Sequence, residues 1–326
     1  MFASVLIARR SRHFAGTRYL KRGVSDQGKV ANDVEHEQIL EDNEYSNGQH
    51  GEPGTPTFSS YVQVRGSIPT FWTQESSVTM PKPPIELNRV DPTYRATQLH
   101  FEDLFERYST PVLVLDLVKQ SEKRPRESIV GDQYRSAVDY INTTIDSDRD
   151  KILYCSFDYS HTSKHRQLDV SSSLSEISTW AVNSTGFFCS NPKWKMMAGG
   201  ILEPFSQDDR QFADSMTEEV GVPVFPMEQK GVLRTNCIDC LDRTNVAQFS
   251  AGVEAVTQQL VVMGIRSQSK LDPSSNVVRV LIDMYVELGD AIALQYGGSE
   301  AHKKMTSSES NIMPIGKVSQ MERYRV

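Results

Sequence analysis

A cysteine and an arginine separated by five residues, Cys237 and Arg243, are the part of this chain best suited to chemistry. A loop of that length can wrap a phosphate group, with a sulfur nucleophile at one end, a guanidinium at the other and backbone N–H groups between them. A free cysteine has a pKa of about 8.5, and helix N–H groups and a neighbouring guanidinium lower that pKa. The spacing alone is a weak signal, because it arises by chance in about one chain in five.

The residue types in the loop suggest a role for each member. Cys237 would attack phosphorus as a thiolate, and the planar fork of Arg243 would hold two phosphate oxygens. An alcohol leaving group needs a proton, for which Asp239 and Asp242 are the nearest acids and Asp239 is our choice. The alternative is that either acid only caps the following helix or pairs with Arg243. Backbone dipoles and Arg243 supply positive charge, so no metal or cofactor is predicted. The residues expected to contact the substrate are Asn236, Ile238, Cys240, Leu241, Asp242 and Thr244.

Cys237 also forms a Cys-x2-Cys pair with Cys240, which leaves other chemistry open. A thioredoxin-like redox pair and half of a zinc site both have this spacing. A zinc site needs two further ligands, for which His161 and His165 are the candidates at helical spacing. A regulatory disulfide between the two cysteines is a further alternative, because a thiol of low pKa is readily oxidised. We favour the phosphate loop over zinc binding and redox catalysis.

The residues around the loop predict a strand before it and a helix after it. Residues 231–233 are typical of the end of a short strand, and Gly264 stands where a helix C-cap would. A helix that begins directly behind the loop would attract an anion through its free N–H groups and its macrodipole. The apolar residues that recur at helical spacing are Val246, Phe249, Val253, Val256, Leu260 and Met263.

Strands alternate with helices through the rest of the chain, which favours an α/β fold with a layered sheet flanked by helices. The apolar runs 111–118 and 152–157 are typical of strands buried on both faces. A helix capped by residues 272–275 is expected to be interrupted at Gly289. The other segments with helical spacing are 98–108, 124–141 and 168–182.

The chain as a whole limits the classes of function. It has 326 residues, of which 38% are hydrophobic, enough for the core of one large domain or two ordinary ones. The net charge of −7 argues against nucleic acid as a partner. No run of apolar residues reaches the length of a membrane span, so no transmembrane segment is predicted. The polar stretch 42–60, which contains Gly and Pro, is predicted to be a mobile surface loop.

The N-terminal residues are basic, and the first acidic residue is Asp26. An Arg-rich and acid-free start is typical of a mitochondrial transit peptide. The alternative is a strand or turn of the fold with a basic face toward an anionic ligand. The cationic residues in this stretch are Arg9, Arg10, Arg12, Arg18, Lys21 and Arg22.

The string at 234–245 resembles the signature R-x-N-C-x-D-C-L-D-R-T-N of the Sac-domain phosphoinositide phosphatases, and each fixed position of that signature is met. Segments 7–23, 30–38, 65–72 and 294–299 are also similar to that family. The resemblance thus extends over most of the chain. For residues 7–23 it favours interior domain sequence over a transit peptide.

The resemblance implies a cysteine-dependent phosphoric monoester hydrolase that acts on phosphoinositides. The form of the signature found here is similar to the branch that removes the 5-phosphate of phosphatidylinositol 3,5-bisphosphate, which implies a phosphocysteine intermediate. That branch implies a peripheral position on the cytosolic face of endosomal or vacuolar membranes, with a scaffold protein and the opposing lipid kinase as partners. It also implies that residues 1–326 are a catalytic region that lacks most of the family's N-terminal subdomain and its longer C-terminal region.

Two other functions are compatible with the same residues. A truncated chain would serve as a catalytically silent scaffold or lipid-binding module, and the same loop would serve a phosphoprotein phosphatase. The loop alone does not fix which ring phosphate is removed. Candidate contributors to that choice are the cations Arg10, Arg12, Lys164 and Arg166.

Overall fold

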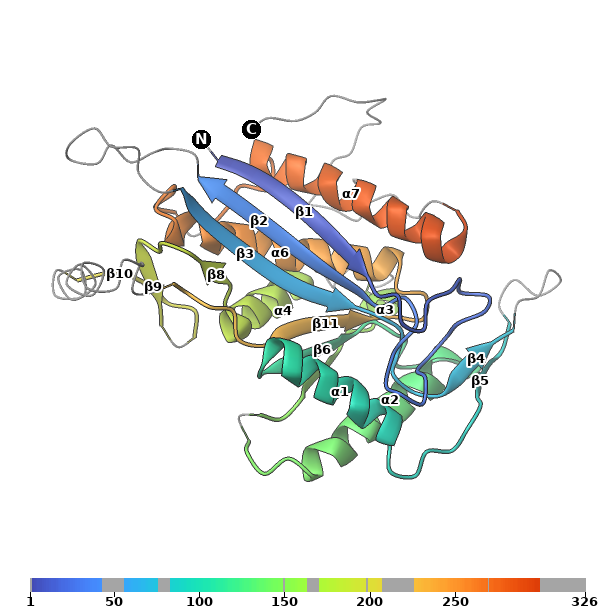
Figure 1. The fold of residues 1–326 in the computed structure, drawn as a ribbon. Helices are drawn as coiled ribbons and strands as arrows, with labels where there is room; N and C mark the ends of the chain where they lie inside the picture. The colour runs from blue at the N-terminus through green and yellow to red at the C-terminus, as the bar shows by residue number, and fades with distance from the viewer. Residues whose placement is uncertain are drawn as a thin grey trace.

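The computed structural model describes residues 2–42, 56–75, 83–148, 150–162, 170–197, 199–206, 226–268 and 270–299. A seven-stranded sheet forms its centre, with helices on both faces (Figure 1). This arrangement confirms the predicted α/β fold. The strands of the sheet are β1 (Phe2–Arg10), β2 (Val34–Asp42), β3 (Thr57–Arg65), β6 (Val112–Asp116), β7 (Leu153–Ser156), β8 (Phe188–Cys189) and β11 (Val232–Asn236).

The sheet is antiparallel on one side and parallel on the other. Its order is β1-β2-β3-β11-β6-β7, and β8 pairs with β3. Strands β1, β2 and β3 are antiparallel to one another, whereas β3, β11, β6 and β7 run parallel. The strand that precedes Cys237 therefore lies in the middle of the sheet, and all five of its residues are buried. The basic N-terminal residues lie in an edge strand and the loop that follows it.

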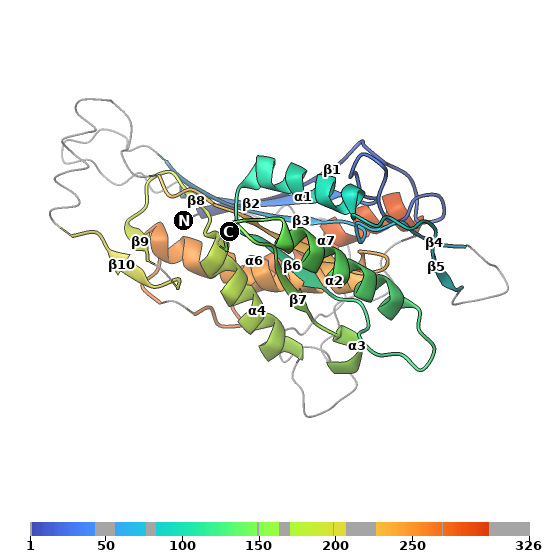
Figure 2. The ribbon, with the colours of Figure 1, turned by 90° about the horizontal axis from the view of Figure 1, so that it is seen from below.

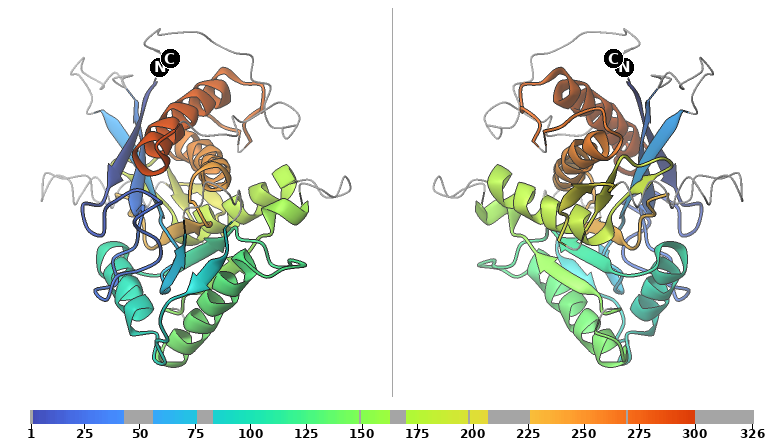
Figure 3. Two further views of the ribbon diagram at one scale, coloured as in Figure 1. Left: turned by 90° about the vertical axis from the view of Figure 1, so that its right-hand side faces the viewer. Right: turned by 90° about the vertical axis from the view of Figure 1, so that its left-hand side faces the viewer.

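Two hydrophobic cores lie on the two faces of the sheet. Helices α4 (Val170–Thr185), α6 (Asp242–Val262) and α7 (Asn276–Gly297) lie on one face, and α1 (Arg95–Tyr108) and α2 (Glu127–Thr143) lie on the other (Figures 2 and 3). Strand β6 feeds both cores, because successive side chains of a strand point to opposite faces. Its residues Leu113 and Leu115 pack with α6, and Val112 and Val114 pack with α2.

Short elements lie at the two ends of the sheet. Strands β4 (Trp72–Gln74) and β5 (Ile85–Leu87) pair at the end where β11 leads into the cysteine loop (Figure 1). Strands β9 (Trp194–Met196) and β10 (Leu202–Pro204) pair at the opposite end. A short helix, α3 (Tyr159–Thr162), follows β7.

Helix α7 starts as predicted but is not interrupted. The Ser275 side chain caps it by accepting a hydrogen bond from the Val278 N–H. The predicted break at Gly289 is wrong, because the helix continues to Gly297. Gly289 serves packing instead: a Cβ atom there would lie 2.6 Å from the Asn245 amide nitrogen of α6.

Two further expectations need correction. Residues 152–157 were expected in a strand buried on both faces, but β7 is the edge strand and its side chains are half-buried or exposed. The predicted loop 42–60 is too long at its C-terminal end, because β3 already begins at Thr57. Residues 43–55 of that loop lie outside the described residues. None of the described helices combines the length and the apolar character that crossing a bilayer requires.

Candidate active site

The predicted order of strand, loop and helix is confirmed around Cys237. Strand β11 ends at Asn236 and α6 begins at Asp242, so residues 237–241 form the connection. Helix α6 ends at Val262, and Gly264 follows with φ +77°, which agrees with the predicted C-cap. The first N–H groups of a helix have no acceptor within the helix and are directed at whatever lies before it. Here that position is occupied by the loop.

The Cys237 thiol has two hydrogen-bond donors. Its Sγ accepts a bond from the Cys240 backbone N–H at 2.9 Å and from the Thr244 hydroxyl at 3.4 Å. Burial raises the pKa of Cys237, but the hydrogen bond from Cys240, the charge of Arg243 and the Thr244 hydroxyl together lower it to about 6. Together these contacts favour the thiolate form of Cys237 over the neutral thiol.

Cys240 differs from Cys237 although only two residues separate them. Its Sγ donates to the carbonyl oxygens of Gly66 at 2.9 Å and Cys237 at 3.0 Å. Burial raises the pKa of Cys240 well above its ordinary value, and the hydrogen bond and negative charge of Cys237 raise it further. Both cysteines are free thiols. Among the described residues, no three His, Cys, Asp or Glu side chains are grouped as metal ligands, and His165 of the zinc alternative lies outside them.

Arg243 lies in the first turn of α6 and pairs with an acid that the sequence did not indicate. Its Nη1 donates to Glu127 Oε2 at 2.9 Å and to the Leu117 carbonyl at 2.9 Å, and its Nη2 donates to Glu127 Oε1 at 3.4 Å. Glu127 is the first residue of α2 and is 8% exposed. The ion pair that the structure shows for Arg243 is thus with Glu127, rather than with Asp239 or Asp242 as the alternative had it.

Asp239 is held by a second arginine. Arg22 donates from Nη1 to Asp239 Oδ1 at 2.6 Å and to the Ile238 carbonyl at 2.9 Å. The Asp239 side chain is 41% exposed, and its negative charge opposes ionisation of Cys237. Asp242 lies in the first turn of α6, where a carboxylate interacts favourably with the helix dipole. Both loop acids are half-exposed, and of the two it is Asp239 that pairs with Arg22.

The back of the loop is held by side chains from the N-terminal third of the chain. Arg65, at the end of β3, donates to the carbonyls of Cys240 and, at 2.9 Å, Leu241. Asn32 donates to the same Cys240 carbonyl at 3.3 Å. Cys240 has a left-handed backbone with φ +50°, a conformation that costs free energy in a residue other than glycine. These contacts hold the loop in that shape.

The front of the loop offers unused donors. Within the described residues, the N–H groups of Ile238, Asp239 and Leu241 donate no hydrogen bond, whereas carbonyls of the same loop are held from behind. A set of N–H groups turned one way beside a helix N-terminus is an anion site. Of the residues predicted to contact substrate, Ile238 and Leu241 belong to this set, whereas the Cys240 N–H already donates to Cys237 Sγ.

Asn236 and Thr244 are brought to the loop but are fully buried. The Asn236 amide donates to Asp116 Oδ1 at 2.6 Å and accepts from Arg234 at 3.1 Å. Burial raises the pKa of Asp116, against the hydrogen bond of 2.5 Å that Tyr154 donates to it. The side chain of Asn236 thus connects the start of the loop to the end of β6.

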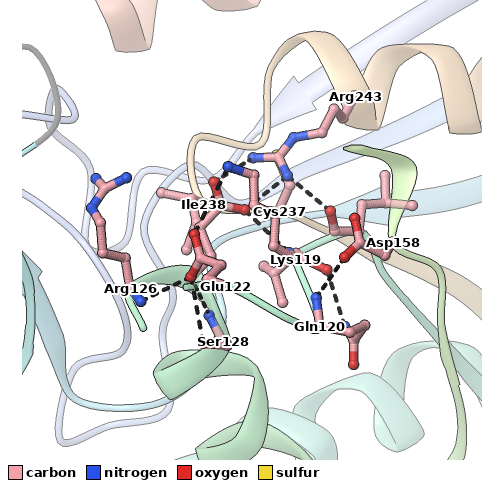
Figure 4. A network of polar contacts seen from close by, with 12 residues as sticks. Lys119, Gln120, Glu122, Arg126, Ser128, Asp158, Cys237, Ile238 and Arg243 are labelled. Atoms are coloured by element: carbon pink, nitrogen blue, oxygen red, sulfur yellow. Dashed lines mark hydrogen bonds and ion pairs between the residues drawn. The ribbon is translucent and has the colours of Figure 1, made fainter. Parts of the chain in front are cut away.

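Sequence reasoning missed the segment between β6 and α2. Figure 4 shows it beside Cys237 and Arg243. Its backbone is tied down by carboxylates: Glu122 accepts from the N–H groups of Arg126 at 2.8 Å and Ser128 at 3.1 Å, and Asp158 accepts from that of Gln120 at 2.9 Å. Lys119, 28% exposed in its side chain, belongs to this segment and forms an ion pair with Glu122 at 3.8 Å. Lys164 and Arg166, named above as candidates, lie outside the described residues.

These features define a buried thiol of lowered pKa after a central parallel strand, in the loop that opens α6. A family profile described as the SacI homology domain matches residues 1–164. The chain belongs to this family. The family expected from the 234–245 string is thereby confirmed, by a part of the chain that lies before the string.

Curated relatives match over nearly the whole chain. The phosphatidylinositol-3-phosphatase SAC1 of Arabidopsis thaliana is 42% identical over 92% of this chain and 36% of its own length. The polyphosphoinositide phosphatase of Schizosaccharomyces pombe is 45% identical over 90% of this chain and 32% of its own. The phosphoinositide phosphatase SAC2 of Arabidopsis thaliana is 40% identical over 93% and 40%. The chain thus spans roughly a third of the length of these relatives.

Proposed function

We propose that this protein is a phosphoinositide phosphatase that hydrolyses a phosphomonoester through a phosphocysteine intermediate. One observation carries the proposal: the Cys237 thiol, with a pKa of about 6, lies in an anion-binding loop at the start of α6. A thiolate in that place is a nucleophile for phosphorus. The similarity to relatives named phosphoinositide phosphatases supports the substrate class.

In the proposed first step, the Cys237 Sγ–P bond forms as the ester P–O bond breaks. The N–H groups of Ile238, Asp239 and Leu241 bind the phosphoryl oxygens, as do Arg243 and the helix dipole. Asp239, which is paired with Arg22 in the free protein, takes up a proton as the polyanionic substrate binds and gives it to the leaving alcohol oxygen. Water then attacks phosphorus, the S–P bond breaks, and Asp239 takes the proton of the water. Inorganic phosphate leaves and the thiolate is restored. Asp242 and Thr244 shape the loop, and Thr244 donates to the sulfur.

The finer assignment is the 5-phosphate of phosphatidylinositol 3,5-bisphosphate, with the protein at the cytosolic face of endosomal or vacuolar membranes. The likeness of the signature to that branch supports it, and the same likeness suggests a scaffold protein and the opposing lipid kinase as partners. One relative carries a 3-phosphatase name. Ring position is therefore the first point to test.

Short-chain, soluble phosphatidylinositol 3,5-bisphosphate offered to the purified protein tests the proposal. We expect release of inorganic phosphate that Cys237→Ser abolishes and that Cys155→Ser, a half-buried cysteine of β7, leaves unchanged. The lipid product, phosphatidylinositol 3-phosphate or 5-phosphate, reports the ring position. Lipid binding without release would identify a silent binding module, and faster turnover of a phosphotyrosine peptide would identify a phosphoprotein phosphatase.

Asp239→Asn tests the general acid separately. A proton donor matters when the leaving group is an alkoxide and matters little when it is p-nitrophenolate. We expect a loss of on the order of 100-fold on the lipid and a much smaller loss on p-nitrophenyl phosphate. Equal losses on both would assign Asp239 to structure through its pairing with Arg22.

A further inference from the structure

The loop after β1 lies beside the candidate active site and is fixed to it. Arg22, 8% exposed, bonds to Asp239 and, at 3.1 Å, to Gln74 of β4. Tyr296, in the last turn of α7, donates to the Lys21 carbonyl at 2.9 Å and accepts from the Arg18 N–H at 2.9 Å. Figures 1 and 2 show this loop, the β4–β5 pair and the end of α7 together. The loop is thus part of the rim of the site.

The tip of this loop carries two exposed apolar side chains. Tyr19 is 55% exposed and Leu20 is 79% exposed. They stand on a closed turn, in which the N–H groups of Leu20 and Lys21 both donate to the Thr17 carbonyl at 2.9 Å. A leucine so exposed on an ordered turn gains nothing for the fold. Burial against another surface would remove its apolar area from water.

Positive charge surrounds the tip without neutralising carboxylates. No Asp or Glu precedes Asp26 in the chain. Among the described residues, Arg12, Arg18 and Lys21 form no ion pair; Arg18 instead lies over the Tyr19 ring at 5.1 Å. A small apolar tip on a loop whose cations lack carboxylate partners fits an anionic bilayer surface, where tyrosine and leucine enter the interface and cations meet lipid head groups.

We propose that the loop 11–22 is the surface by which this protein docks on an anionic membrane. Tyr19 and Leu20 enter the lipid interface, and Arg12, Arg18 and Lys21 bind anionic head groups. Two apolar side chains are too few for the core of a stable protein interface, whereas charge and slight insertion together give reversible membrane binding. The link from Arg22 to Asp239 then presents the phosphate loop to head groups. This last clause rests on the proposed lipid substrate.

Vesicle sedimentation with the full chain tests the docking. We expect binding to vesicles of phosphatidylcholine with phosphatidylserine, weaker binding in high salt and none to phosphatidylcholine alone. The double variant Tyr19→Ser/Leu20→Ser should bind about 10- to 100-fold more weakly. The matched control is Ile201→Ser, which removes an apolar side chain that is 60% exposed at the opposite end of the sheet, in the turn before β10. Unchanged binding of the double variant, or an equal loss with Ile201→Ser, overturns the proposal.

A fluorescence measurement complements the loss of vesicle binding expected for the double variant. Leu20→Trp should show a blue-shifted emission on anionic vesicles, relative to the parent protein, and no shift would count against insertion. Turnover of soluble and of vesicle lipid distinguishes the proposed docking surface from the proposed phosphatase activity. The double variant should match the parent on soluble short-chain lipid and fall behind it on vesicles. If the parent hydrolyses neither, the proposed function fails while vesicle binding still decides the docking surface.

Discussion

At the scale of single residues, the site separates two cysteines by what each sulfur contacts. Cys237 Sγ receives two hydrogen bonds, from the Cys240 N–H and from the Thr244 hydroxyl, so its charged form is stabilised. Cys240 Sγ instead donates hydrogen bonds to two carbonyl oxygens, and these contacts favour its neutral form. The two cysteines of the Cys-x2-Cys pair therefore differ: Cys237, the proposed nucleophile, has a lowered pKa, and Cys240 has a raised one.

Glu127 orients the arginine of the loop, which leads to a first prediction at this scale. It holds both terminal nitrogens of Arg243 through its two oxygens, a fork-to-fork contact that fixes the guanidinium plane. Glu127→Gln should lower kcat/KM on soluble lipid by about 10- to 100-fold, since a hydrogen bond to a charged group contributes about 1.5–3 kcal/mol. Steady-state kinetics would measure it.

The Glu127→Gln variant also distinguishes two roles for Glu127: orienting Arg243 toward the phosphate, or holding Arg243 away from it. If Glu127 held Arg243 away from the phosphate, its replacement would raise activity rather than lower it. Glu102→Gln is the matched control, because Glu102 pairs with Arg95 on the exposed side of α1. Surface ion pairs contribute little, so this control should keep parental kinetics.

At the scale of elements, a buried arginine of β3, Arg65, joins that strand to the loop, and β11 carries a second buried arginine, Arg234, bonded to His100 and the Ser67 carbonyl. Arg65 and Arg234 are each 1% exposed, and neither forms an ion pair within the described part of the chain. Arg65 extends from the end of β3 to the loop carbonyls, and burial lowers its pKa to about 10. A buried cation without a carboxylate is costly. Negative charge on Cys240, Cys237 and Asp242 opposes the fall in the pKa of Arg65, and a phosphate bound as proposed would add to it.

Arg65→Met should therefore loosen the loop as well as the fold. It removes the donors to two buried carbonyls, and we expect a loss of about 2–4 kcal/mol in the free energy of unfolding in urea. Inorganic phosphate should raise the melting temperature of the parent protein and not that of the variant. Arg95→Met, which changes an arginine that is 55% exposed, should cost less than about 1 kcal/mol. Equal losses in the two variants would contradict an anchoring role for Arg65.

The elements that the sequence predicted well are those fixed by local pattern. The apolar spacing located helix α6, although the helix is buried on nearly all sides rather than on one face, and the loop before it has its cysteine and arginine only six positions apart. Whether a strand lies at the edge of a sheet cannot be predicted from its own residues. Residues 152–157 have the apolar run of a central strand, yet β7 pairs on one side only. Gly289 likewise has the form of a helix breaker and serves packing against Asn245.

The partners of the loop could not be predicted for the same reason. Glu127 is 116 positions from Arg243, and Arg22 is 217 positions from Asp239. No periodicity links such pairs, and a carboxylate at a helix start is more often explained by the helix dipole. Which acid pairs with Arg243 and which arginine pairs with Asp239 is therefore determined by the tertiary fold.

At the scale of the whole molecule, the antiparallel and parallel halves of the sheet supply different parts of the candidate site. Parallel strands β11 and β6 end at the site, as ligands in α/β proteins usually lie beyond the carboxyl ends of such strands. The antiparallel half supplies Arg65 and the rim loop that contains Arg22. Both halves bury ionisable groups, including His36 and His100, each enclosed in the protein and next to a buried arginine.

These buried groups set how stability depends on pH. Burial lowers the pKa of His36 and of His100 well below 6.5, and the charges of Arg65 and Arg234 lower them further. Below pH 6.5 the unfolded chain binds protons that the folded protein excludes, so the free energy of unfolding should fall as the pH drops. Cys237 contributes in a higher pH window, between the ordinary cysteine pKa of about 8.5 and about 6. There too the unfolded chain binds the extra proton, so stability should rise with pH.

Urea unfolding of the parent protein and of Cys237→Ser across this range isolates the thiolate. Both proteins share the histidines, whose contribution cancels in the difference between the two. That difference should grow in favour of the parent from pH 6 to pH 9, by no more than about 4 kcal/mol for a shift of this size. A difference that stays constant with pH would mean that Cys237 is a neutral thiol in the folded protein, and the nucleophile proposed above would lose its activation.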